Sequence, residues 1–292
     1  MINTEDLERI VRDIDDKFNV SNVAIPRRVI NCIAEVSKIL KISLPILATK
    51  ENSKESDAYM ITYLISEWYK NMYGNRLRIN IDIGFLIILL RGELLVCRIP
   101  NFFGTCKFFI EEDLSYECLD DETNILKMID GMTQGFADSL SDNEKEMIFL
   151  SFSKALEASE IIQSWLNFEL KMFQAAINDL MSVRDNIKLN APHLSNAKWS
   201  YNQFIEKVIK SWLLYAGVEP EKVKELNHFI SKIVDKFNLT FIEQLNKHDL
   251  DSIKGNPGLR YDEVVVTQDE LIAIQDKIFD AIKCIGFKPT IS

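Results

Sequence analysis

The chain opens with three runs whose apolar residues recur every three or four positions, the spacing that places them on one face of an α-helix. The runs extend over residues 4–18, 26–44 and 56–73. Thr4 is expected to cap the first helix, Pro26 suits the first turn of the second, and Gly74 suits the end of the third. In the third run we expect an inward face made of Met60, Ile61, Leu64, Ile65, Trp68 and Met72.

Between Gly74 and Ile110 the hydrophobic period changes from helical to alternating. Apolar and polar residues alternate over 77–82, and residues 85–90 form a short apolar run. Arg91-Gly92-Glu93 resembles a tight turn, because Gly92 is free to adopt positive φ. With further strands over 94–99 and 104–110, the pattern predicts a three- or four-stranded antiparallel meander.

Helical spacing returns after residue 122 and continues through the rest of the chain. We expect a helix over 123–132 and then either one very long helix or two abutting ones within 136–191, which lacks glycine and proline. The apolar stripe shifts near 163–167, which indicates a bend. Later helices are expected over 195–216, 220–237, 239–248 and 267–284.

These patterns predict a predominantly α-helical α+β protein with two regions. Residues 1–120 are expected to hold the three N-terminal helices and the small antiparallel sheet. Residues 121–292 are expected to form a helical bundle around a long helix.

Composition restricts where the protein works and what it contacts. The chain has 292 residues, a net charge of −10 and no uninterrupted apolar run long enough to span a bilayer. Its five cysteines are scattered, odd in number and without a C-x-x-C pair. Together with an acidic N-terminus that does not resemble a signal peptide, these features predict a cytoplasmic protein with reduced thiols and no membrane partner.

One charge asymmetry stands out against this acidic background. Residues 70–110 carry six basic and two acidic side chains, whereas residues 111–122 carry seven acids and no base. We expect the arginines of the basic segment to form one surface that meets an acidic partner, which is either the chain's own 111–122 segment, another protein or a nucleic-acid backbone. These arginines are Arg76, Arg78, Arg91 and Arg98.

Aromatic residues interleave with these arginines, as they do on sheets that bind single-stranded nucleic acid. The alternative is that the aromatic face packs on the third helix, and we favour it because the whole chain is acidic.

Motifs that carry catalytic chemistry are almost absent. The order of His228 and then His248-Asp249 matches the order of metal ligands in HD-type metal phosphohydrolases, but we favour the alternative that the His248-Asp249 pair is a solvated helix end. Phosphate-binding, dinucleotide-binding, serine-hydrolase and zinc-protease motifs are missing. We therefore assign no catalytic residue and no cofactor.

Two classes of function remain as hypotheses. The first is a non-catalytic interaction or regulatory protein that binds a protein partner, for instance within a multi-protein assembly. The second is a nucleic-acid-directed effector or metal-dependent phosphohydrolase of a microbial defence system, with His228, His248 and Asp249 as metal ligands and nucleic acid at the basic sheet.

The cysteine pattern makes a direct prediction. We expect thiol titration of the denatured protein, without added reductant, to find five reactive groups per chain, because none is committed to a disulfide. A count of three or one would show that cysteines are paired.

Overall fold

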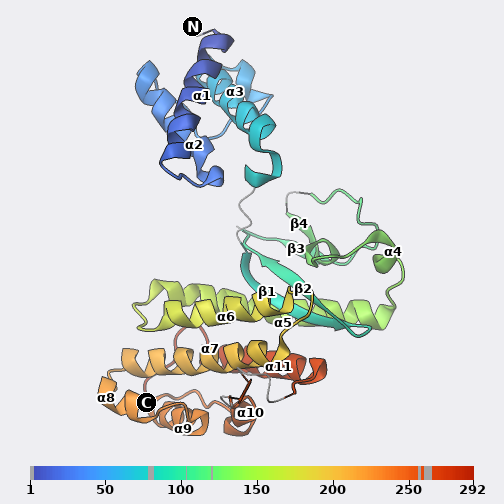
Figure 1. Cartoon of the computed structure of the whole chain (residues 1–292), viewed down its shortest axis with the longest axis vertical. Coiled ribbons are helices and arrows are strands. Elements are labelled where there is room, and N and C mark those ends of the chain that lie inside the picture. Colours follow the sequence, from blue (N-terminus) through green and yellow to red (C-terminus); the bar gives the residue numbers. More distant parts are fainter. Residues whose placement is uncertain (1–2, 78–81, 103, 120, 256–257, 260–264) are drawn as a thin grey trace. The chain divides into compact units, whose positions relative to one another are not determined.

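The computed structural model describes residues 3–77, 82–102, 104–119, 121–255, 258–259 and 265–292 (Figure 1). It is predominantly helical with a small antiparallel sheet, so the α+β prediction is confirmed. The chain divides into two compact units, Met1–Asn80 and Ile81–Ser292. The strands therefore group with the helices that follow them, whereas the predicted regions placed them with the helices that precede them.

The first unit consists of the three predicted helices, with two short 3₁₀ turns. Asn3, rather than Thr4, caps the first helix by accepting a hydrogen bond from the Asp6 amide at 2.7 Å. Ser56 caps the third helix. The elements are α1 (Thr4–Val20), α2 (Ile25–Leu40), η1 (Asn52–Lys54), α3 (Asp57–Tyr73) and η2 (Gly74–Leu77). Their shared core contains Leu7, Val11, Ile14, Cys32, Ile33, Val36, Ile61, Ile65 and Tyr69.

A buried polar network joins these three helices at one point. The Arg28 guanidinium from α2 lies 3.2 Å from the Asp15 carboxylate of α1 and 2.6 Å from the Asn19 amide oxygen. The Tyr73 hydroxyl at the end of α3 donates to Asp15. Burial and this hydrogen bond raise the pKa of Tyr73. The further hydrogen bonds that Arg28 and Asp15 make offset the cost of burying this ion pair.

The second unit begins with a β-hairpin of two strands, β1 (Asp82–Leu90) and β2 (Glu93–Pro100). The predicted turn is confirmed, since Leu90 pairs with Glu93 and the two intervening residues have positive φ, 50° at Arg91 and 84° at Gly92. This conformation suits the right-handed twist of a two-residue hairpin.

On the outer edge of each strand, one residue is hydrogen-bonded by a group from a distant part of the chain. On β1, the Ile87 amide donates to Gln275 Oε1 at 2.8 Å, and Gln275 Nε2 donates back to the Ile87 carbonyl at 2.9 Å. On β2, the Asp130 amide donates to the Val96 carbonyl at 2.8 Å. The hairpin can be buried because these edge groups do not remain unpaired.

The predicted meander does not extend beyond this hairpin in the residues that the structure describes. The next strand, β3 (Lys107–Phe109), instead pairs in parallel with β4 (Glu122–Asn124). The acidic segment between them therefore leads from the end of β3 back to the level at which β3 begins. The expected helix over 123–132 is replaced by β4 and the 3₁₀ turn η3 (Ile125–Met128). Most of the strand expected over 77–82 lies outside the described residues.

The rest of the second unit is helical, and the bend predicted near 163–167 is confirmed as a break between two helices. Met172, with φ of 69°, precedes the second of them. The helices are α4 (Gln134–Ala137), α5 (Asp142–Ser164), η4 (Trp165–Asn167), α6 (Phe173–Ile187), α7 (Leu194–Tyr215), α8 (Pro220–Glu225), α9 (Ile230–Thr240), α10 (Lys247–Asp251) and α11 (Gln268–Ile285). Where one helix was expected over 220–237, α8 and α9 are separated by residues 226–229. No helix in the described ranges has the length and apolar character needed to cross a bilayer.

The hairpin lies directly against α5, whose buried residues include the small side chains of Ala155, Ala158 and Ser159. Ala155 and Ala158 are fully buried, and a Cβ atom at Gly84 would come within 2.1 Å of Ser159 Oγ. Gly84 is thus needed for the close approach of strand and helix.

We expect Gln275→Leu to lower the free energy of unfolding by about 2–4 kcal/mol, because it leaves the Ile87 amide, the Ile87 carbonyl and the Tyr201 hydroxyl without their partner. Urea denaturation measures the loss. The same chemical change at the exposed Gln174 of α6 is the control. Equal effects of the two substitutions would contradict the assigned role of Gln275.

Candidate binding site

Of the four arginines singled out in the sequence, Arg91 and Arg98 belong to the hairpin and contact different carboxylates. Arg91 forms an ion pair with Glu144 at 2.8 Å and also donates to the Ser139 carbonyl at 2.6 Å. Arg98 lies 4.0 Å from a carboxylate oxygen of Asp82 and 3.6 Å from one of Asp130.

The other two arginines precede the hairpin. Arg76 belongs to the first unit, with its guanidinium carbon 5.2 Å from the centre of the Tyr73 ring. Arg78 lies outside the described residues. A single surface shared by all four arginines therefore stays a prediction.

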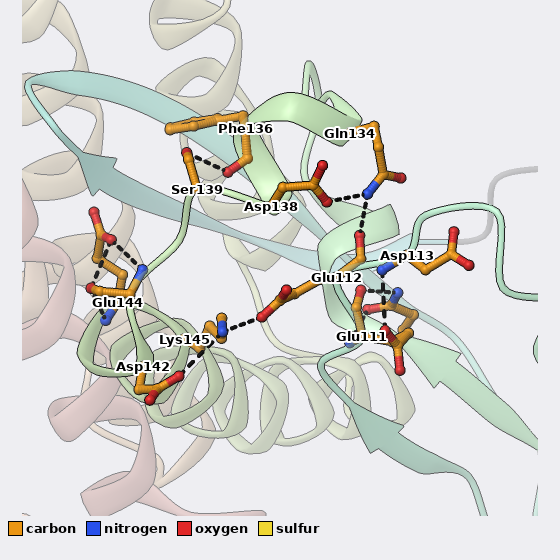
Figure 2. A network of polar contacts seen from close by, with 12 residues as sticks. Glu111, Glu112, Asp113, Gln134, Phe136, Asp138, Ser139, Asp142, Glu144 and Lys145 are labelled. Atoms are coloured by element: carbon orange, nitrogen blue, oxygen red, sulfur yellow. Dashed lines mark hydrogen bonds and ion pairs between the residues drawn. The ribbon is translucent and has the colours of Figure 1, made fainter.

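In the part of the chain that the structure describes, two lysines and the Gln134 amide hold the acidic segment. Figure 2 shows Glu112 paired with Lys145 of α5. The Gln134 side chain accepts a hydrogen bond from the Leu114 amide at 2.9 Å and donates one to the Glu112 carbonyl at 2.9 Å. Lys107 pairs with Glu122 at 3.1 Å. The segment is thereby fixed against α4, α5 and β3.

The candidate metal ligands do not gather into a metal site. His248 is 95% exposed, and its ring lies 3.9 Å from the Asp249 carboxylate next to it. His228 belongs to the break between α8 and α9 and contacts Glu206 of α7 instead. Among the residues described, no three His, Cys, Asp or Glu side chains are placed to hold a metal ion together.

A concave surface lies on the first unit, along the seam between α1 and α3. Two adjoining cavities of about 370 and 550 Å³ share Thr4, Leu7 and Leu64 as lining residues. The first cavity is lined by two matching rows, each spaced i, i+3, i+4, i+7, i+8. The rows are Thr4, Leu7, Glu8, Val11 and Arg12 on α1, and Leu64, Glu67, Trp68, Asn71 and Met72 on α3. We call the two cavities together the α1/α3 groove.

The α1/α3 groove has an apolar floor and a charged rim. Leu7 and Val11 are buried at its base, whereas Met60 and Met72 are 39% and 56% exposed. Three carboxylates, from Glu8, Asp57 and Glu67, and the single guanidinium of Arg12 line the two cavities. The surface therefore combines apolar contact area with an excess of negative charge.

The sequence analysis missed this groove because it assigned the apolar residues of α3 to one inward face. In the structure they form two adjacent stripes. Ile65 and Tyr69 are buried in the core of the first unit, whereas Met60, Leu64, Trp68 and Met72 line the groove, and Ile61 belongs to both. The width of the apolar face of α3 was the signal in the sequence for a second apolar surface, since a helix that packs through one face needs fewer apolar residues.

Comparison with known proteins finds no matching family model, no matching curated protein and no matching solved structure. The interpretation of the site therefore rests on its own geometry.

The Arg91–Glu144 pair makes stability depend on pH. Hydrogen bonds from Arg91 and from Ser141 lower the pKa of Glu144 from 4.5 to about 2. A depressed folded-state pKa contributes stability above the ordinary pKa, and this contribution is lost as the pH falls towards 2.

We therefore expect Arg91→Gln to lower the thermal midpoint at neutral pH and to have a smaller effect near pH 2, where Glu144 is partly protonated and the hydrogen bond from Arg91 to the Ser139 carbonyl remains. Thermal scans across this range measure the difference between variant and wild type. Arg9→Gln, which removes an exposed pair with Asp6 on α1, serves as the control. A destabilisation by Arg91→Gln that is independent of pH would rule out the ion pair as its cause.

Proposed function

We propose that this protein is a non-catalytic interaction protein whose first unit binds an amphipathic α-helix of a partner protein in the α1/α3 groove. The observation that carries the proposal is the pair of matching rows on α1 and α3, which line an open cavity in the described structure.

The spacing of the rows supports a helical ligand. Residues at i, i+3, i+4, i+7 and i+8 form the ridge that one helix presents to another. Two such ridges side by side leave a channel that accepts the apolar stripe of a third helix. The rows span eight residue steps, so the contact covers about 12 Å, or roughly two turns of the bound helix.

The side chains in the groove support a particular kind of partner. Met60 and Met72 are unbranched and adaptable, which suits an apolar stripe of variable shape. The excess of carboxylates on the rim favours a helix whose apolar stripe is flanked by lysine or arginine.

The second hypothesis from the sequence, a metal-dependent phosphohydrolase or nucleic-acid-directed effector, has less support. His228, His248 and Asp249 do not converge within the described structure, and Arg91 and Arg98 already contact carboxylates. The interaction function is therefore the one that we put forward.

Fluorescence anisotropy with a labelled synthetic peptide tests the proposal. The peptide has roughly 16 residues, about four turns, with leucines at i, i+3, i+4 and i+7 and lysines beside them. We expect saturable binding to the full-length protein, and we expect Met72→Glu to weaken it at least about tenfold, or by ~1.4 kcal/mol, by placing a charge in the apolar channel.

The control substitution is Val20→Glu, at an apolar residue that is 85% exposed and outside the groove. It should leave binding unchanged, and circular dichroism should show both variants folded. The control peptide has the same composition with its leucines scrambled. Equal binding of the two peptides, or equal loss in the two variants, would overturn the proposal.

A further inference from the structure

His228 is held in an unusual way in the break between α8 and α9. Its Nδ1 lies 3.0 and 3.1 Å from the two carboxylate oxygens of Glu206, which belongs to α7. The Glu206 side chain is 4% exposed, whereas that of His228 is 75% exposed. A buried carboxylate is therefore hydrogen-bonded to one nitrogen of an imidazole that is otherwise exposed to solvent.

A buried lysine completes this arrangement. Lys210, one helical turn after Glu206, donates to the Glu206 carboxylate at 2.8 Å and to the Asn227 carbonyl at 2.5 Å. Asn227 has a φ of 49°, a left-handed conformation that non-glycine residues adopt at a cost. Lys210 thus fixes the residue before His228 as well as the group that His228 contacts.

These contacts select one tautomer of the imidazole. Glu206, in its ion pair with Lys210, is a hydrogen-bond acceptor, so Nδ1 of His228 must donate. In the neutral ring the lone pair then lies on Nε2. A carboxylate that holds Nδ1–H in this way fixes the tautomer and the orientation of the ring, so that Nε2 presents its lone pair away from Glu206.

A helix N-terminus follows directly. The helix α9 starts at Ile230 with no side-chain cap, and its first internal amide donors are those of Lys232 and Ile233. The earlier amides of an uncapped helix start favour a nearby anion. Negative charge placed on His228 would lie only two residues from this end.

We propose that His228 is a nucleophilic histidine that accepts a phosphoryl group on Nε2 from a donor that carries phosphorus on nitrogen. The Nε2 lone pair forms the new N–P bond, and the electron pair of the donor's P–N bond leaves with its amine. The Nδ1 proton stays in the hydrogen bond to Glu206. This activity is independent of the helix-binding function of the first unit.

Two other uses of an oriented imidazole lack their second component in the described residues. No hydroxyl or thiol is hydrogen-bonded to His228 there, so the ring has no side-chain nucleophile to deprotonate. No further ligands are grouped with it for a metal ion. Direct attack by Nε2 on a substrate needs neither a neighbouring hydroxyl or thiol nor further metal ligands.

Incubation of the full-length protein with phosphoramidate tests the proposal, with ammonia as the leaving group. Peptide mapping by mass spectrometry under alkaline conditions then locates acid-labile phosphohistidine. The chain supplies its own references in His193 and His248. We expect His228 to be labelled at least about tenfold faster than His248, although His248 is the more exposed of the two at 95%. If solvent exposure alone set the rate, His248 would be labelled faster than His228.

A substitution of Glu206 tests whether the orientation of the His228 ring by this carboxylate causes the faster labelling. Glu206→Gln should reduce labelling of His228 towards the rate of His248 and leave His248 itself unchanged. If this variant does not fold, the comparison within the wild-type protein still decides. Equal rates at His228 and His248 in the wild type, or an unchanged rate at His228 in folded Glu206→Gln, would overturn the proposal.

Discussion

A two-stranded hairpin surrounded by helices must find partners for the backbone groups on both of its outer edges, and the second unit is organised around this requirement. The Gln275 side chain bonds both backbone groups of Ile87, much as a residue of a third strand would do. The main chain at Asp130 bonds Val96 on the other strand. Since Gln275 also accepts from Tyr201, one amide joins the hairpin, α7 and α11.

The helices and the hairpin turn were predictable because their signals are local. Apolar spacing located α1, α2, α3, α7 and α11, and the Arg91-Gly92-Glu93 turn needed only a residue tolerant of positive φ. The pairing of β3 with β4 was not predictable, since parallel partners can be any short segments that the fold brings together. The separation of α8 from α9 was also missed, because no proline or glycine marks residues 226–229.

The candidate sites were less accessible to sequence analysis than the fold. Their polar partners are far apart along the chain, as with Arg91 and Glu144 or His228 and Glu206. His228 was noticed as a histidine near other histidines, but its partner is a glutamate buried in α7. The α1/α3 groove depends on which apolar stripe of α3 is left uncovered, and only packing decides this.

The long reach of Gln275 has a consequence for how the chain folds while it is being synthesised. Gln275 follows Ile87 by 188 residues, so the hairpin cannot be completed until α11 has left the ribosome. The core of the first unit, in contrast, is made only of residues within Met1–Asn80. The first unit is therefore free to fold early, while the nascent second unit keeps an open strand edge until translation reaches α11.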